Sequence, residues 1–330
     1  MKLWVFGLLV LSGAGCGRYA DFTLPRPEGQ PQKVGISWVA ETAPVITRGA
    51  AGEWDQSDVL NPSVVSHGGR YYNFYSGFDG KTWHTGLAIS ADAVHWEKQG
   101  RVLSPDPASW EGGYIAANGH ALWDGNEFLY WYQAGNPPRI GLARSSDGKR
   151  WTKLPTPVVE LGPYGSWDER GVADPYVIRT ADAWYLYYLG QDRAGRQRLG
   201  VARSTDAVTW TKLRGNPILE LGLYGAFDET GLGEPAVWAS DGWWWMLYTG
   251  RDWQENRRIG VARSSDGVHW ERLPQVFSGS EPWMSKVICD PTVEVLSNEI
   301  RVWFGGGNVA RPDERLNGQI GLARLVMKRE

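Results

Sequence analysis

Short runs of alternating hydrophobic and polar residues recur along the whole chain, and no long helical period interrupts them. Four such runs follow one another after residue 173: DPYVIRT, AWYLYYLG, RLGVARS and the segment around Trp210. The same order returns as EPAVWAS, GWWWMLYTG, RIGVARS and the segment around Trp270. Period-two runs of this length, bounded by glycine and proline, predict strands joined by tight turns. The sequence therefore predicts an all-β protein.

A longer repeat organises these strands. The string Gly-(Leu/Val)-Ala-x-Ser-x-Asp-x-x-x-Trp occurs at 86–96, 141–151, 200–210 and 260–270, and a truncated copy, GLARLVMKRE, stands at 321–330. The tryptophan missing from that copy is Trp38, near the other end of the chain. With it, the repeated tryptophans stand 55 to 60 residues apart. This period with four strands per repeat predicts a five-bladed β-propeller of four-stranded antiparallel blades, its ring closed by an N-terminal strand that completes blade five.

The first residues have the order of an export signal. Lys2, the apolar run 3–11 and the small residues before Cys16 predict a signal peptide over 1–16, with lipidation of Cys16 or plain secretion as the two alternatives. Residues 17–34 are polar and proline-rich and are predicted to be a tether, and 35–330 to be one propeller domain. We expect a cell-envelope lipoprotein held to the membrane by that lipid, otherwise a periplasmic or secreted protein.

Composition narrows the partners. The chain has 330 residues, 22% of them charged, and a formal net charge of -3. Without a basic surplus to neutralise phosphates, nucleic acid is not an expected partner. Twenty tryptophans and fourteen tyrosines are more than core packing requires, so part of this aromatic surface is expected to line a groove. We expect a monomer.

The Ser-x-Asp turns of the repeat have a structural interpretation. An aspartate at this place in a hairpin accepts hydrogen bonds from its own backbone. Antiparallel order also places these turns at the end of each blade away from the start of its first strand. Asp92, Asp147, Asp206 and Asp266 are therefore predicted to be structural.

The repeats disagree at one polar position. The residue predicted to open the innermost strand of each blade is, in turn, Asn61, Asn118, Asp174, Glu234 and Asp290. The innermost strands of a propeller ring its axis, so these five side chains are expected to converge on one pocket. Carboxylates that converge raise the pKa of at least one of their carboxyl groups. A carboxylic acid next to a carboxylate can cleave a glycosidic bond. The alternative is that they only cap strands around the axis.

The arrangement resembles the five-bladed propeller glycosidases of glycoside hydrolase families 32, 43, 62, 117 and 130, over nearly the whole mature chain. The family 43 resemblance implies that Glu234 is the catalytic acid and Asp174 a carboxylate that tunes and orients it. That family has its base aspartate where this chain has Asn61, and an amide cannot accept a proton from water. Asp58 is the nearest replacement, with a solvent-exposed loop acid as its alternative interpretation.

Family 130 implies different roles. LNPSV (60–64) and GVADPY (171–176) are similar to its motifs, so Asn61 would contact sugar and Asp174 would donate the proton. Tyr176 stands where that family has arginine, which counts against phosphorolysis. The two resemblances agree that Asp174 is functional and leave its role open.

The loops beside the axial residues are expected to complete the pocket. Those before the third and fourth innermost strands bring Tyr164, Trp167, Arg170, Tyr224 and Phe227 towards the acids, although Trp167 and Phe227 can equally be packing residues. On the same face, the loops between the second and third strands contribute Asp79, Gln133, Asn136 and segments 190–197, 250–257 and 305–317. Such aromatic faces and planar polar groups bind sugars.

No histidine spacing typical of a metal site occurs, and no cofactor is expected, although His120 can face the axis and hold a water or a structural calcium. The sequence thus predicts a glycosidase-like protein that cleaves an oligo- or polysaccharide, with Glu234, Asp174 and Asp58 as catalytic candidates. The predicted sugar contacts are Asn61, Asn118, His120, Trp167, Arg170, Tyr176 and Asp290. The alternatives are a non-catalytic carbohydrate-binding propeller and an interaction propeller that binds protein.

Overall fold

A computed structural model describes residues 18–297 and 299–329, so the predicted signal peptide with Cys16 lies outside the described residues. These residues form twenty-one strands and one 3₁₀ turn, Pro282–Met284. The prediction of an all-β protein is confirmed. Within the described ranges, no helix has the length and apolar character needed to cross a membrane.

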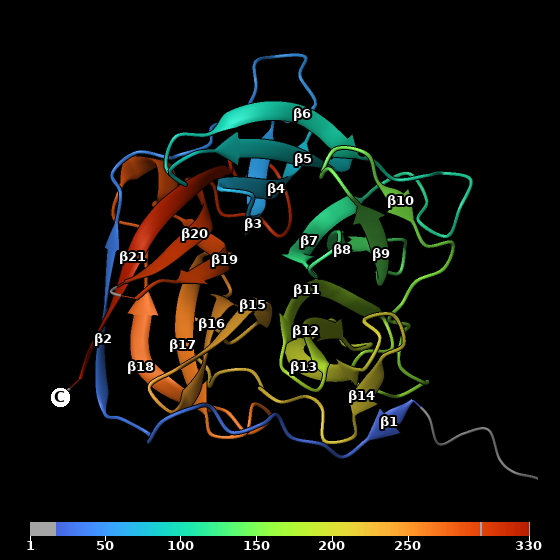
Figure 1. Ribbon diagram of the computed structural model, residues 1–330. Helices are drawn as coiled ribbons and strands as arrows, with labels where there is room; N and C mark the ends of the chain where they lie inside the picture. The colour runs from blue at the N-terminus through green and yellow to red at the C-terminus, as the bar shows by residue number, and fades with distance from the viewer. Residues whose placement is uncertain (1–17, 298, 330) are drawn as a thin grey trace, which may run out of the picture.

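The strands form groups of four antiparallel neighbours, which lie around a common centre (Figure 1). Group 1 consists of β3 (Asp58–His67), β4 (Arg70–Phe78), β5 (Trp83–Ser90) and β6 (Glu97–Leu103). Group 2 consists of β7 (Ala116–Trp123), β8 (Phe128–Ala134), β9 (Arg139–Ser145) and β10 (Thr152–Lys153). In both groups the first strand lies nearest the centre.

The next two groups repeat this order. Group 3 consists of β11 (Gly171–Arg179), β12 (Trp184–Gln191), β13 (Gln197–Ser204) and β14 (Thr211–Leu213). Group 4 consists of β15 (Gly231–Ser240), β16 (Trp243–Arg251), β17 (Arg257–Ser264) and β18 (Glu271–Phe277). Single parallel pairings, Gln197 with Gly231 and Arg257 with Val287, link group 3 to group 4 and group 4 to the last group.

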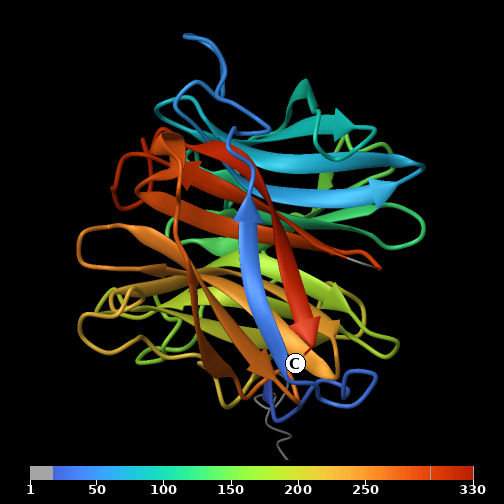
Figure 2. The ribbon, with the colours of Figure 1, turned by 90° about the vertical axis from the view of Figure 1, so that its left-hand side faces the viewer.

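Group 5 takes its strands from both ends of the chain. It consists of β19 (Val287–Val295), β20 (Ile300–Gly307), β21 (Gln319–Arg329) and β2 (Val34–Ala40). Strand β2 pairs antiparallel with β21 from Val34–Arg329 to Ala40–Ala323, and the two run side by side in Figure 2. Trp38 stacks on Phe277 with ring centroids 5.0 Å apart, which packs β2 against group 4.

The described part of the predicted tether is packed against the strands. Strand β1 (Tyr19–Ala20) pairs in parallel with β14, and the chain then runs along the lower edge of Figure 1 to β2. Leu24 is buried and donates its backbone N–H to Asp266 O, while Trp244 Nε1 donates to Pro25 O. Leu24 and the backbone of this segment thus find partners on groups 3 and 4, so the described part of the predicted tether lies against the strands.

The repeated Ser-x-Asp turns close the hairpins as predicted. Asp206 Oδ1 accepts the backbone N–H groups of Val208 and Thr209 at 2.9 and 2.7 Å, and Ser204 donates to the same carboxylate. Equivalent bonds surround Asp92, Asp147 and Asp266. The structural interpretation of these aspartates is confirmed.

A loop aromatic covers the middle of each group, because two glycines leave room for it. In group 3, a Cβ on Gly190 or Gly200 would lie 2.2 and 2.5 Å from the Trp167 ring. The side chains that lie on glycines in this way are Trp54, Trp110, Trp167, Phe227 and Trp283. These aromatics fix each loop to its own group, so the loop residues that follow are held at the first strand.

Candidate active site

The five variable axial residues converge as the sequence predicts. Asn61, Asn118, Asp174, Glu234 and Asp290 all line one pocket of about 390 Å³. They come from β3, β7, β11, β15 and β19, the first strands of the five groups. The pocket therefore draws one axial side chain from every group.

The axial residues do not open their strands, which corrects the prediction. Each lies within its strand, at a bulge where the pairing register shifts, as between Ala173 and Tyr176 in β11. Their φ angles are 47° to 53°, in the left-handed region that side chains other than glycine rarely adopt. A bulge turns a side chain out of the pleat, so five bulges aim five side chains at one point. Strain repeated at a pocket is typical of a functional site.

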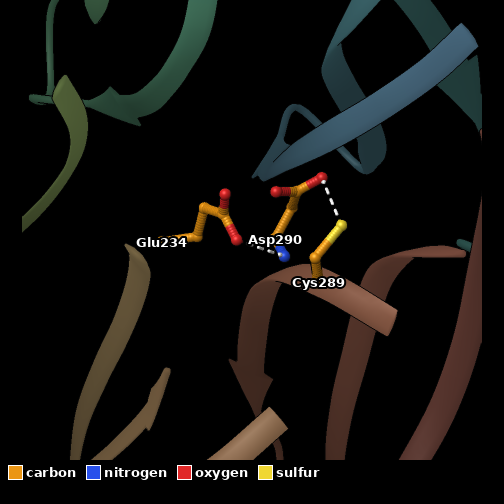
Figure 3. A group of neighbouring side chains, drawn as sticks. All are labelled: Glu234, Cys289 and Asp290. Atoms are coloured by element: carbon orange, nitrogen blue, oxygen red, sulfur yellow. Dashed lines mark hydrogen bonds between the residues drawn. The ribbon is translucent and has the colours of Figure 1, made fainter. Parts of the chain in front are cut away.

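Four of these residues form a chain of hydrogen bonds around the axis. Asn61 donates its backbone N–H to Asp290 Oδ2 at 3.1 Å, and the Asp290 N–H points to Glu234 Oε2 at 3.4 Å (Figure 3). The Glu234 N–H in turn donates to the Asp174 carboxylate. Each carboxylate thus holds the backbone of the next group, which fixes the acids relative to one another.

Burial sets the protonation of this cluster. Asp174 and Asp290 are buried, and desolvation followed by the charge of Glu234 raises the pKa of both carboxyl groups well above the usual value. The buried guanidinium of Arg257 opposes these shifts. A carboxyl group that keeps its proton near neutral pH, close to a second carboxylate, is what acid–base cleavage of a glycosidic bond requires.

The outer wall comes from the loops predicted to face the acids. Asn118 Nδ2 donates to Gln133 Oε1 at 3.3 Å, and Arg251 Nη2 donates to Gln197 Oε1 at 2.9 Å. The loop between β20 and β21 adds Asp313, whose Oδ1 lies 3.9 Å from Arg251 Nη1. Predicted segments 190–197, 250–257 and 305–317 all contribute to the lining, whereas Trp83 and Tyr114 carried no repeat signal that could have identified them.

Asp58 is not in the pocket, which corrects its prediction as a catalytic base. Its carboxylate accepts the backbone N–H groups of Arg315, Leu316 and Gly318 at 2.5, 2.9 and 2.8 Å. The side chain is fully buried, and this desolvation raises its pKa. Asp58 therefore anchors the loop that carries Asp313 and has no access to substrate in this geometry.

His120 and Tyr176 lie on the far side of the bulges, so they are not sugar contacts in this pocket. Both line a separate axial cavity of about 30 Å³, where their rings are 4.0 Å apart. His120 Nδ1 accepts the N–H of Val177, and burial lowers its pKa to about 3. A histidine that accepts a backbone hydrogen bond and packs on an aromatic ring is a core residue rather than a calcium ligand.

A second group has the ligand types of a metal site. Oxygens of Glu234 and Asp290 and the Cys289 sulfur lie within 4.8 Å of one another (Figure 3). Cys289 Sγ donates to Asp290 Oδ2 at 3.1 Å, and Arg257 already supplies positive charge to these groups. The arrangement is satisfied by a thiol proton and a guanidinium, which does not fit a resident cation.

The predicted aromatic wall divides into two sets. Trp167 packs over Gly190 and Gly200, and Arg170 is exposed outside the pocket lining, so neither contacts a sugar there. Phe227 packs like Trp167. Tyr164 and Tyr224 instead remain exposed on the same loops. The glycines opposite Trp167 and Phe227 are the signal that separates the two sets.

Comparison with known proteins identifies a glycosidase family. Residues 61–216 and 141–299 match the glycosyl hydrolases family 32 N-terminal domain. A probable sucrose-6-phosphate hydrolase of Psychromonas ingrahamii is 33% identical over 162 residues, 44% of this chain and 28% of that protein. A 1,2-beta-oligomannan phosphorylase of Thermoanaerobacter sp. is 27% identical over 180 residues, 51% of this chain and 54% of that protein.

A solved structure shares the fold. It represents the family 130 of mannoside phosphorylases, described as containing glycoside hydrolases that target β-1,2 mannosidic linkages in Candida mannan. It superimposes with a TM-score of 0.69 at 17% identity, over 92% of this chain and 96% of that one. The strand groups around the pocket therefore follow the β-propeller architecture of glycosidases.

Proposed function

Because the chain belongs to the β-propeller glycosidase superfamily, we propose that it cleaves a glycosidic bond in the pocket lined by Asp174, Glu234 and Asp290. The observation that carries this proposal is the hydrogen-bonded chain of these three acids at the axis. We assign the proton donor to Asp174, whose burial favours the carboxylic acid form, and the second carboxylate of the reaction to the half-buried Glu234.

We also propose that the strand groups are the five blades of a propeller and that β2 closes the ring as the outer strand of blade five. The pairing of β2 with β21 supports this closure, because it removes the free edge that β21 would otherwise expose. Residues 35–330 then act as one domain. We further propose export to the cell envelope, supported by the apolar run 3–11 before Cys16.

Kinetics on a substrate panel test the catalytic assignment. We would assay the wild-type protein on sucrose 6-phosphate, β-1,2-mannobiose and dinitrophenyl glycosides, the first two chosen from the names of its relatives. Asp174→Asn and Glu234→Gln should each lower kcat by about 10² to 10⁴-fold on the natural linkage, the usual contribution of a general acid or base. Asp206→Asn, in a turn away from the pocket, is the matched control and should retain activity.

The leaving group identifies the donor. A dinitrophenolate departs without protonation, so Asp174→Asn should keep most of its activity on that substrate and Glu234→Gln should not. The reverse pattern would assign the donor to Glu234. A phosphorylated sugar as product would show phosphorolysis instead of hydrolysis.

A non-catalytic carbohydrate-binding protein is the second candidate, favoured by Asn61 at the place of the family 43 base. Asn61 lines the pocket and its amide cannot activate water. That candidate predicts glycan binding by the wild-type protein without turnover of any panel substrate.

A further inference from the structure

Several large exposed apolar side chains lie in loops that lead to residues of the pocket lining. Among the described residues, those with high exposure are Val39, Tyr114, Tyr164, Leu223, Tyr224, Trp253, Val276 and Val295. Tyr114 lines the pocket itself. Tyr164 and Tyr224 are in the loops that lead to Gly171 and Gly231, two further lining residues. Exposed aromatic clusters next to a pocket are typical of interaction surfaces.

Trp253 is a further exposed aromatic beside the pocket lining. It is 73% exposed and lies in the hairpin whose two ends, Arg251 and Arg257, line the pocket. Tyr164 and Tyr224 are 84% and 94% exposed. Such exposure of three aromatic side chains has no explanation in core packing, because the neighbouring loop aromatics Trp167 and Phe227 already fill the space over the glycines.

Groups 3 and 4 hold Tyr164 and Tyr224 in loops that share the same backbone hydrogen bond. Glu169 Oε2 accepts the N–H of Gly165 at 2.9 Å, and Glu229 Oε2 accepts that of Gly225 at 2.7 Å. Each bond fixes the tight turn that follows the tyrosine. Two loops of near-identical sequence therefore present Tyr164 and Tyr224 in the same way.

In group 3 the facing hairpin places a second planar group on the tyrosine. In group 3 the Arg193 guanidinium lies 4.0 Å over the Tyr164 ring, and Arg193 also donates to the Tyr164 hydroxyl at 2.6 Å and to Glu169 at 3.0 Å. In group 4 the aligned hairpin position is Trp253. Group 3 thus presents Tyr164 with Arg193 against its ring, and group 4 presents Tyr224 and, on its own hairpin, the exposed Trp253.

The cluster is confined to one side of the pocket. Three residues before the packing aromatic, groups 1 and 2 have Ala51 and Pro107 where groups 3 and 4 have Tyr164 and Tyr224. Groups 3 and 4 are also the ones that contribute Asp174 and Glu234. A ligand that leaves the acids towards these groups would meet the aromatic faces.

We propose that Tyr164, Arg193, Tyr224 and Trp253 form an outer glycan-binding surface, so that the substrate is an extended oligo- or polysaccharide and not a free disaccharide. This inference rests on the glycosidase function proposed above. A pocket of about 390 Å³ is near the lower end of small-molecule sites, so a longer chain must continue outside it. Aromatic faces pack under the C–H bonds of sugar rings, and a guanidinium donates to their hydroxyls.

Affinity gel electrophoresis in levan, arabinan or yeast mannan tests the surface. We would compare wild-type protein with Tyr164→Ala and with the double variant Tyr224→Ala/Trp253→Ala, using Val295→Ala as an exposed apolar control on β19. The wild-type protein and the control should be retarded by one of the polysaccharides. The double variant should bind it about 10-fold more weakly, as expected for the loss of two aromatic contacts.

Short substrates separate this inference from the catalytic proposal. On a dinitrophenyl monosaccharide the double variant should keep wild-type kcat and KM, while its KM on the polysaccharide rises about 10-fold. Wild-type cleavage of short substrates without retardation by any of the three polysaccharides would overturn the outer surface alone. A wild-type protein that neither cleaves nor binds any glycan would overturn both proposals.

Two further outcomes would also overturn the outer surface. Equal losses on short and long substrates would place these side chains in the pocket reaction itself. Self-association in sedimentation experiments that the double variant abolishes, with unchanged polysaccharide retardation, would make the surface a contact between two copies of the chain.

Discussion

At the scale of single residues, the burial and the backbone strain of the axial acids lower the stability of the fold. Asp290 is buried, and its pKa is raised by desolvation and by the charge of Glu234. A group whose pKa is raised on folding contributes most to the free energy of unfolding at low pH, and that contribution is lost as the pH rises towards the folded-state pKa. The left-handed backbone at Asp290, with φ of 53°, adds strain at the same place. Destabilising features of this kind persist in proteins where a functional site requires them.

Asp290→Asn should therefore stabilise the fold at neutral and alkaline pH. The amide keeps an oxygen to accept the Asn61 N–H and removes the buried charge. The gain should be smallest near pH 4, grow as the pH rises, and level off above the folded-state pKa. Thermal unfolding of both proteins from pH 4 to 9 measures it, and each kcal/mol corresponds to about 2–4 °C.

The difference between the two proteins is the informative quantity. Asp147, Asp206 and Asp266 have a pKa of about 2, so their contribution is present above the unfolded-state pKa and lost as the pH falls through the folded-state value. These terms cancel between wild type and variant. A constant difference across the pH range would show that Asp290 carries no perturbed charge.

The sequence predicts the identity of the axial residues but not their conformation. Asn61, Asn118, Asp174, Glu234 and Asp290 stand out because the repeats disagree there. The bulges at these residues do not stand out in the sequence. A left-handed backbone conformation at a glutamate is locally unfavourable, and it is imposed by the strands on either side. Asp58 was the wrong base candidate because proximity in sequence to Asn61 says nothing of direction, and a strand alternates its faces.

At the scale of structural elements, four groups share a buried polar triad that the fifth lacks. In group 3, Asp168 Oδ2 accepts the Tyr188 hydroxyl at 3.2 Å and Lys212 Nζ at 2.5 Å. The corresponding triads are Asp55–Tyr75–Lys98, Glu111–Tyr132–Lys153 and Asp228–Tyr248–Arg272.

The aligned residues of group 5 are all apolar. They are Met284, Phe304 and Ala40, the last of them on β2. Acid, hydroxyl and cation have been replaced together within one chain. This pattern is consistent with a triad whose members stabilise the fold only together.

Removing one member of the triad should destabilise the fold far more than replacing all three. Lys212→Met leaves the fully buried Asp168 without its cation and should destabilise the fold by about 3–5 kcal/mol. The triple variant Asp168→Met/Tyr188→Phe/Lys212→Ala copies group 5 and should lose less than Lys212→Met alone. Urea unfolding of the two variants measures this, and a triple variant that loses as much stability as Lys212→Met, or more, would contradict the coupling.

An alignment of the repeats identifies these triads only once the structure has shown which residues are hydrogen-bonded to one another. The tyrosine, the acid and the lysine are about 20 to 45 residues apart in group 3, so periodicity within a strand does not connect them. The Ser-x-Asp turns were predictable because all their bonds are local.

At the scale of the whole molecule, the N-terminal segment ties three strand groups together. Strand β1 pairs with β14 of group 3, Leu24 and Pro25 contact group 4, and β2 completes group 5. Trp243 Nε1 also donates to Gln32 O at 3.1 Å. The sequence predicted β2 from the missing tryptophan, whereas 18–33 resembled a tether because its proline-rich composition shows no alternation. Its contacts come from β14 and from aromatic side chains of groups 3 and 4, which the segment itself does not encode.

Truncation separates the two roles of this segment. Removing residues 1–33 deletes β1 and the contacts of Leu24, whose burial alone is worth about 1.5–3 kcal/mol. Because β2 and every pocket residue remain, this variant should stay folded, melt several degrees lower and keep its activity or glycan binding. Removing residues 1–42 also deletes β2, exposes the edge of β21 and the ring of Phe277, and should give soluble aggregates. Size-exclusion chromatography and thermal unfolding compare the two variants. If both are monomeric and equally stable, β2 is not needed to close the ring.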